Sequence, residues 1–102
     1  MSIREVAEGL LEQGSDESLA YSIATANWAS EPTDVSVKVY DENVMVDVTS
    51  TVMPANFPSV TDDVISLWRL ENLTQGAFYR VEVQFTANGN VYECYFRVRC
   101  VG

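Results

Sequence analysis

The sequence contains no histidine among its 102 residues. Without imidazole it cannot build the Ser-His or Cys-His pairs that activate a nucleophile, and it lacks the side chain best suited to proton transfer near neutral pH. Metal sites that need imidazole ligands are excluded for the same reason. The composition therefore argues against most classes of enzyme, and we expect a non-enzymatic protein without cofactors or a catalytic metal.

Basic residues are scarce as well. Six Lys and Arg stand against fifteen Asp and Glu, which gives a formal net charge of -9. A protein of this sign repels a phosphate backbone instead of releasing its counterions. We therefore expect no nucleic acid among the partners of this chain.

Long apolar runs are missing too. No stretch of the sequence approaches the roughly 20 apolar residues of a transmembrane helix, and no basic segment followed by a hydrophobic run marks a signal peptide. We expect no membrane partner. The protein should stay in the cytoplasm where it is made, or leave the cell as part of an assembly.

Cysteine is limited to Cys94 and Cys100. Six residues apart on one extended segment, the two would share a face of a strand but stand about 20 Å from each other. A disulfide needs Cα atoms about 5.5 Å apart. The spacing predicts two buried thiols and no intramolecular bridge.

Apolar residues, in contrast, make up 47% of the chain, enough for the core of one compact domain. Over residues 2–13 they follow helical spacing, with glutamates between them and Gly14 after them. This pattern predicts a short amphipathic α-helix within an N-terminal segment, residues 1–14. So short a helix must bury its apolar stripe against this domain or a neighbouring subunit. The stripe consists of Ile3, Val6, Leu10 and Leu11.

Residues 15–102 change to a period of two, with Val, Thr, Tyr and Phe enriched, which is typical of antiparallel β-structure. We expect about six or seven strands and therefore a β-sandwich, with a small closed barrel as the alternative. Strands are expected near residues 19–27, 35–39, 44–48 and 64–70, and an irregular surface loop at 53–59, which contains Pro54 and Pro58.

The last hairpin has the strongest local signal. Asn88-Gly89 is typical of a two-residue type I′ turn, which determines the pairing of both flanking strands. In that register Val83 lies opposite Cys94 on the inner face, and Arg80 lies opposite Arg97 on the outer face. Two opposed arginines are destabilising unless a carboxylate lies nearby, and Glu82 and Glu93 are the expected neighbours.

The segment from Leu73 to Tyr79, with Gly76 inside it, resembles the tyrosine corner of immunoglobulin-like sandwiches. The resemblance implies an all-β fold, an immunoglobulin-like antiparallel β-sandwich preceded by the short N-terminal α-helix. It also implies a structural role for Tyr79, whose hydroxyl would bind backbone groups at the corner.

A second resemblance covers residues 16–101. It consists of the acidic start Asp16-Glu17, Leu19-Ala20-Tyr21, Trp28, the Gly76 to Val81 stretch, and the Asn88-Gly89 hairpin that closes on Phe96-Arg97-Val98-Arg99. In these features the chain is similar to small virion proteins of tailed bacteriophages, often described as fibre–tail adaptor proteins. The resemblance implies a structural protein of the virion, made in the host cytoplasm, that forms a homo-oligomer and docks tail, portal or fibre proteins. The alternative is a capsid decoration (cement) protein bound to the major capsid protein.

The candidate interface residues come from three places. One is the apolar stripe of the expected helix, and another is Phe57 in the proline loop. The last is a row on the outer face of the final hairpin, where arginine and tyrosine give the composition of an interface core. This row consists of Arg80, Tyr95, Arg97 and Arg99.

Two further patterns suggest ligands. Carboxylates at Asp62-Asp63 and in the turn at residues 41–43 could bind calcium, but neither forms a complete calcium loop. Aromatic side chains could form a platform for sugar rings, so a carbohydrate-binding module is the second alternative. In this set Phe57 is expected to be exposed and Trp68 to belong to the core. The other two aromatic candidates are Trp28 and Tyr40.

Overall fold

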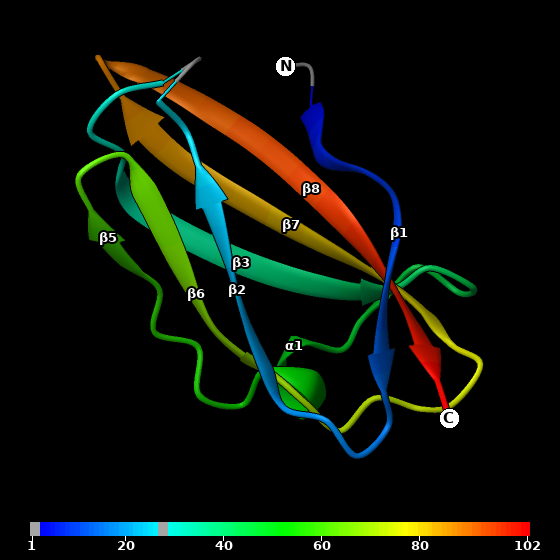
Figure 1. Ribbon diagram of the computed structural model, residues 1–102. Helices are drawn as coiled ribbons and strands as arrows, with labels where there is room; N and C mark the ends of the chain where they lie inside the picture. The colour runs from blue at the N-terminus through cyan, green and yellow to red at the C-terminus, as the bar shows by residue number, and fades with distance from the viewer. Residues whose placement is uncertain (1–2, 27–28) are drawn as a thin grey trace.

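The computed structural model describes residues 3–26 and 29–102, with the backbone alone for residues 3–9 (Figure 1). Strands account for most of this chain, and the described part has one helix, of four residues. The elements are β1 (Ile3–Gly14), β2 (Leu19–Ala24), β3 (Thr33–Asp41), β4 (Val46–Asp47), α1 (Thr49–Val52), β5 (Ser59–Thr61), β6 (Val64–Leu70), β7 (Phe78–Ala87) and β8 (Asn90–Val101).

The strands form two sheets, which confirms the expected all-β fold. One sheet has five strands in the order β1-β8-β7-β3-β4, and the other has three in the order β2-β6-β5. The pairing of β1 with β8 is parallel, and the other pairs are antiparallel. Figure 1 shows the smaller sheet lying across the larger one.

A single hydrophobic core lies between the sheets. Alternate residues of β7 and β8, such as Val81 and Val98, are fully buried, and so is Ile65 of β6 in the other sheet. The rings of Tyr21 and Phe96 connect the two layers, with centroids 5.2 Å apart. Each large apolar side chain buried here contributes roughly 1.5–3 kcal/mol to the free energy of unfolding. The two sheets therefore stabilise each other as a sandwich.

The final hairpin has the predicted register. Val83 lies opposite Cys94 and Arg80 lies opposite Arg97. Asn88 and Gly89 have φ values of 52° and 77°, the positive pair that a type I′ turn requires. A two-residue turn allows only one register between β7 and β8, so the pairing of these strands could be predicted from the sequence alone. Cys94 and Cys100 are both buried, and they form no disulfide with each other, as expected.

The predicted N-terminal helix is wrong: residues 3–14 form strand β1, which runs parallel to β8. The buried side chain of Gln13 shows why this segment prefers the sheet. Its Nε2 donates to the backbone oxygen of Leu70 at 2.7 Å, and its Oε1 accepts from the Tyr21 hydroxyl at 2.8 Å. Without β1, the edge of β8 would have no backbone partner.

The turn before β7 is held by the predicted tyrosine. The backbone N–H of Thr74 donates to the hydroxyl oxygen of the buried Tyr79 at 2.8 Å. Gly76 has a φ of 84°, in the left-handed region where glycine is favoured, and its N–H donates to the Cys100 oxygen at 3.0 Å. The first bond joins the turn to β7, and the second joins it to the last strand, β8.

The middle of the chain departs from the expected pattern. The predicted strand at residues 44–48 is reduced to the two residues of β4, and a turn occupies residues 42–45. The predicted strand at 64–70 is confirmed as β6. Within residues 3–26 and 29–102, no helical segment has the length and apolar character that a bilayer-spanning helix needs.

Candidate protein-interaction surface

The predicted arginine and tyrosine residues come together on the outer face of the five-stranded sheet. Strand pairing places Arg80 beside Arg97, and Glu82 beside Tyr95. The guanidinium carbon of Arg80 lies 3.9 Å from the centroid of the Tyr95 ring. This is a cation–π contact, which fixes the two side chains relative to each other. We call Arg80, Tyr95, Arg97 and Arg99 the arginine row.

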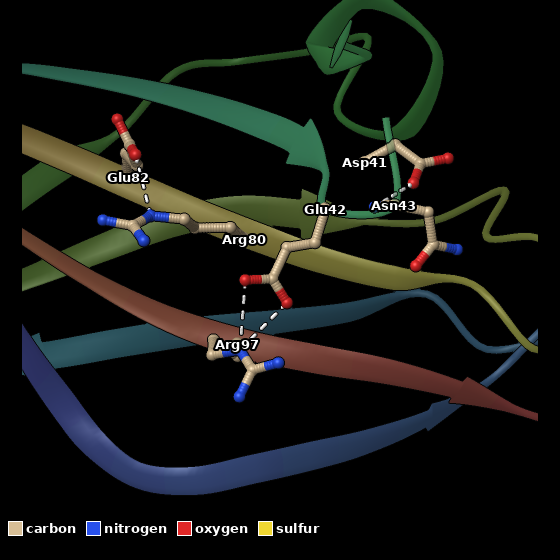
Figure 2. Close-up of polar contacts among 6 residues, drawn as sticks. All are labelled: Asp41, Glu42, Asn43, Arg80, Glu82 and Arg97. Atoms are coloured by element: carbon tan, nitrogen blue, oxygen red, sulfur yellow. Dashed lines mark hydrogen bonds and ion pairs between the residues drawn. The ribbon is translucent and has the colours of Figure 1, made fainter. Parts of the chain in front are cut away.

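Each of the two opposed arginines pairs with a carboxylate, which the sequence analysis made the condition for placing them side by side. Arg80 pairs with Glu82, Nε to Oε2, at 2.8 Å. Arg97 pairs with Glu42, a residue of the turn after β3 (Figure 2). Glu42 was not among the expected partners, whereas the expected Glu93 accepts a hydrogen bond from Gln84 at 3.0 Å instead. Each of these two arginines therefore has its own counter-ion.

Arg99 differs from the other arginines of the row. It is exposed, it lies 5.9 Å from the Phe78 ring, and it makes no ion pair with any side chain that the structure describes. In the parallel pairing with β1 it stands beside Glu12. Arg99 is thus the member of the row whose charge is available to another molecule.

The predicted apolar stripe divides between the two faces of β1. Leu10 lies beside Arg97 with 36% of its surface exposed, so it extends the outer face. Leu11 packs against the core. The side chains of Ile3 and Val6 lie outside the part that the structure describes.

Sequence reasoning missed an apolar turn at the end of this sheet. Val44, Met45 and Val46 are 64%, 58% and 53% exposed, although all three are hydrophobic. The sequence did contain a signal, because three consecutive apolar residues cannot all point to one face of a strand. We call these three residues the apolar turn.

Met45 has an uncommon backbone conformation. Its φ is 52°, in the left-handed region. The other described residues with positive φ, apart from glycines, are Asp, Asn or Glu. For residues other than glycine this conformation costs roughly 1 kcal/mol, and it is more tolerable for Asn and Asp than for Met. The fold therefore keeps a strained, exposed methionine at a position that asparagine would suit better.

Glu42 connects the apolar turn to the arginine row. Its backbone N–H donates to the Phe78 oxygen at 2.8 Å, while its carboxylate accepts from Arg97. One residue earlier, Asp41 accepts the Asn43 N–H on its Oδ1 at 3.0 Å (Figure 2). The base of the turn is therefore held in place before any partner arrives. Together the arginine row and the apolar turn are called the docking surface.

A polar hollow of about 220 Å³ lies on the same sheet face. Charged and neutral polar groups of β3, β7 and β8 line it, so the face is uneven in shape and mixed in charge. A surface of this kind favours a partner of complementary shape over a flat apolar one. The polar lining includes Ser36, Lys38, Tyr40, Glu82, Gln84 and Glu93.

The aromatic candidates are split between the two sheets. Phe57 is 70% exposed, as expected. The prediction that Trp68 belongs to the core is wrong, because Trp68 is 43% exposed on the outer face of the three-stranded sheet. The inward alternation of Ile65 and Leu67 points Trp68 outward. Tyr40 lies on the five-stranded sheet, and Trp28 is outside the described residues.

Three of the four carboxylates considered for calcium, those of Asp41, Glu42 and Asp63, have structural partners. Asp63 accepts the Glu31 N–H on its Oδ1 at 2.9 Å, and its backbone oxygen accepts the Thr25 N–H at 2.8 Å. Asp41 accepts the Asn43 N–H, and Glu42 pairs with Arg97. Within the described part of the chain, no group of three or more cysteines and carboxylates is placed to hold a metal ion.

The chain matches no protein-family model, and no curated protein sequence is significantly similar to it.

Proposed function

We propose that the protein is a non-enzymatic structural protein that docks other proteins through its docking surface. The observation that carries this proposal is the apolar turn, which places Val44, Met45 and Val46 in solvent beside the arginine row. Exposed apolar side chains next to arginine and tyrosine have the composition of an interface core. The strained φ of Met45 adds to the argument, because strain kept at an exposed position favours a functional role.

We also propose that the fold is immunoglobulin-like. The strand orders support this. In the letters used for immunoglobulin strands, β1-β8-β7-β3-β4 corresponds to A′-G-F-C-C′, and β2-β6-β5 corresponds to B-E-D. The bond from Thr74 to Tyr79 supports it as well, since the tyrosine corner uses a hydroxyl in this way. Fold alone carries no function, so the docking role depends on the surface.

We propose further that the partners are virion proteins of a tailed bacteriophage. The basis is the resemblance in sequence to fibre–tail adaptor proteins, and the docking surface supplies a means of contact. In this role the chain forms a homo-oligomer and joins tail or portal proteins to fibres. The alternative within the particle is a decoration protein, which would use the same surface on the major capsid protein.

The test of the virion role is the number of copies per particle. Quantitative mass spectrometry of purified particles of the encoding virus, with an isotope-labelled standard of this chain, measures it. An adaptor ring predicts about a dozen copies or fewer, as closed cyclic symmetry allows, and decoration of a shell predicts hundreds. Absence of the chain from the particles would overturn the virion role.

A further inference from the structure

The outer face of the three-stranded sheet carries a second surface feature, on the other side of the molecule from the docking surface. The rings of Phe57 and Trp68 meet at 5.8 Å between centroids, with an interplanar angle of 89°. Phe57 comes from the loop before β5, and Trp68 comes from β6. Because the two exposed rings are perpendicular, they form an apolar corner on the surface, which we call the aromatic corner.

A hollow of about 320 Å³ opens at this corner. Hydroxyl groups line it beside the rings, because Ser59 and Ser66 are direct partners in the pairing of β5 with β6. Arg69 adds a guanidinium, of which Nη1 donates to the Ser18 oxygen at 2.9 Å. Arginine has five N–H donors, so others remain for a ligand. The hollow therefore combines ring faces with hydrogen-bonding groups at its floor and side.

The charge of the hollow differs from that of the whole chain. The protein carries a net charge of -9, yet none of the described side chains that line this hollow is acidic. The charged side chain in the lining is Arg69, whose guanidinium can donate hydrogen bonds to the hydroxyl groups of a neutral ligand. The size of the hollow suits one or two sugar rings.

We propose that this corner is a binding site for a neutral, β-linked pyranose oligosaccharide of glucose or N-acetylglucosamine units. Equatorial substituents leave such a ring with a flat face of C–H groups, which packs on the Trp68 ring. The edge of the sugar then lies against Phe57. Its hydroxyls exchange hydrogen bonds with Ser59, Ser66 and Arg69.

A second copy of the chain fits the corner less well. A flat sheet face cannot reach the Trp68 ring while Phe57 stands edge-on beside it. A dry contact between sheets would also leave the hydroxyls of Ser59 and Ser66 without partners, at a cost of about 1–3 kcal/mol for each buried group. A sugar supplies those partners from its own hydroxyls.

The test is titration of the full-length protein with cellotetraose and, separately, with N,N′,N″,N‴-tetraacetylchitotetraose. Calorimetry and tryptophan fluorescence are the two readouts. Because the chain has a second tryptophan, the fluorescence change that is lost in Trp68→Phe is the one that comes from this site. We expect saturable binding of at least one sugar, with a dissociation constant on the order of 1 mM for a site with few hydrogen bonds. Phe57→Ala and Trp68→Ala should each weaken binding about tenfold or more.

Val64→Ala is the matched control, because Val64 is an exposed apolar residue of the same strand that does not line the hollow. It should bind as the unchanged protein does, and so should Met45→Asp, which alters only the opposite sheet. Phe57 is so exposed that its loss leaves the fold intact, which circular dichroism verifies. Failure of both sugars to bind overturns the proposal, as does full binding in Phe57→Ala. Dimerisation that Phe57→Ala abolishes, without sugar binding, would assign the corner to a second copy instead.

Discussion

Arg97 on β8 donates its Nε–H to both carboxylate oxygens of Glu42, at 2.9 and 3.1 Å, although 55 positions separate the two residues. The pair is only partly exposed, so solvent screens it less than an ordinary surface ion pair. It fastens the base of the apolar turn to β8, two strands away from β3 in the five-stranded sheet. A partner that binds this face therefore meets a turn that is already ordered, which lowers the entropy cost of binding.

Met45→Asn should stabilise the fold while weakening docking. Asparagine tolerates a φ of 52° better than methionine, so the free energy of unfolding should rise by about 0.5–1 kcal/mol, as measured by urea denaturation. Val44→Asn is the control, because Val44 is equally exposed but has no positive φ. An equal gain in both variants would show that strain at Met45 is not the cause.

Gln13→Leu should cost about 2–4 kcal/mol of stability. The substitution removes the donor to the Leu70 oxygen and the acceptor for the Tyr21 hydroxyl, and so leaves two polar groups in the interior without partners. Gln75→Leu, in an exposed turn, should change stability by less than about 0.5 kcal/mol. Urea denaturation of both variants measures the difference.

Deletion of residues 1–13 tests the contribution of nearly the whole of β1 to stability, as Gln13→Leu tests that of one side chain. Since β1 pairs with β8 and carries Gln13 into the interior, the shortened chain should lose its cooperative unfolding transition. A stable, folded monomer after the deletion would instead mean that the segment serves a neighbouring subunit.

Tyr79→Phe should lower the free energy of unfolding by about 1–2 kcal/mol, because the Thr74 N–H loses its acceptor in the turn before β7. Tyr40→Phe is the matched control: Tyr40 is half-buried on the outer sheet face, and no hydrogen bond involves its hydroxyl among the described residues. If the two variants are equally stable, the corner bond contributes nothing.

Stability should fall at high pH because of Tyr21. Burial, and then the nearby carboxylate of Glu17, raise the pKa of the Tyr21 hydroxyl above its ordinary value of 10.0. As pH rises past that value, Tyr21 loses its proton in the unfolded chain before it does so in the folded protein. The free energy of unfolding therefore falls with pH until the pKa of Tyr21 in the folded protein is passed. The pH profile of stability should therefore be flatter for Tyr21→Phe above pH 10.0. Identical slopes would contradict this origin.

Sequence was most informative where local rules decide the structure. The Asn88-Gly89 turn allowed one register only, and the alternation of Ile65 and Leu67 located β6. The same alternation points Trp68 to solvent, against the general preference of tryptophan for cores. The exposure of Trp68 is therefore predictable from the strand pattern, and the expectation that it belongs to the core is wrong.

Other features depend on contacts between distant segments. Residues 3–14 have helical spacing, yet the open edge of β8 and the buried bonds of Gln13 favour a strand. Tertiary contacts of this kind override weak local propensity. The partner of Arg97 was missed for a related reason, because Glu42 approaches only after β3 has paired with β7.

The most direct test of the docking surface is the mass of the purified protein in solution, measured by light scattering behind a sizing column at low and high salt. We predict a discrete oligomer for the unchanged chain, which Met45→Asp and Arg99→Glu reduce to the monomer. Arg69→Glu, on the opposite sheet, should leave it intact. A mass of 11.4 kDa for the unchanged protein under every condition would contradict self-association through this surface.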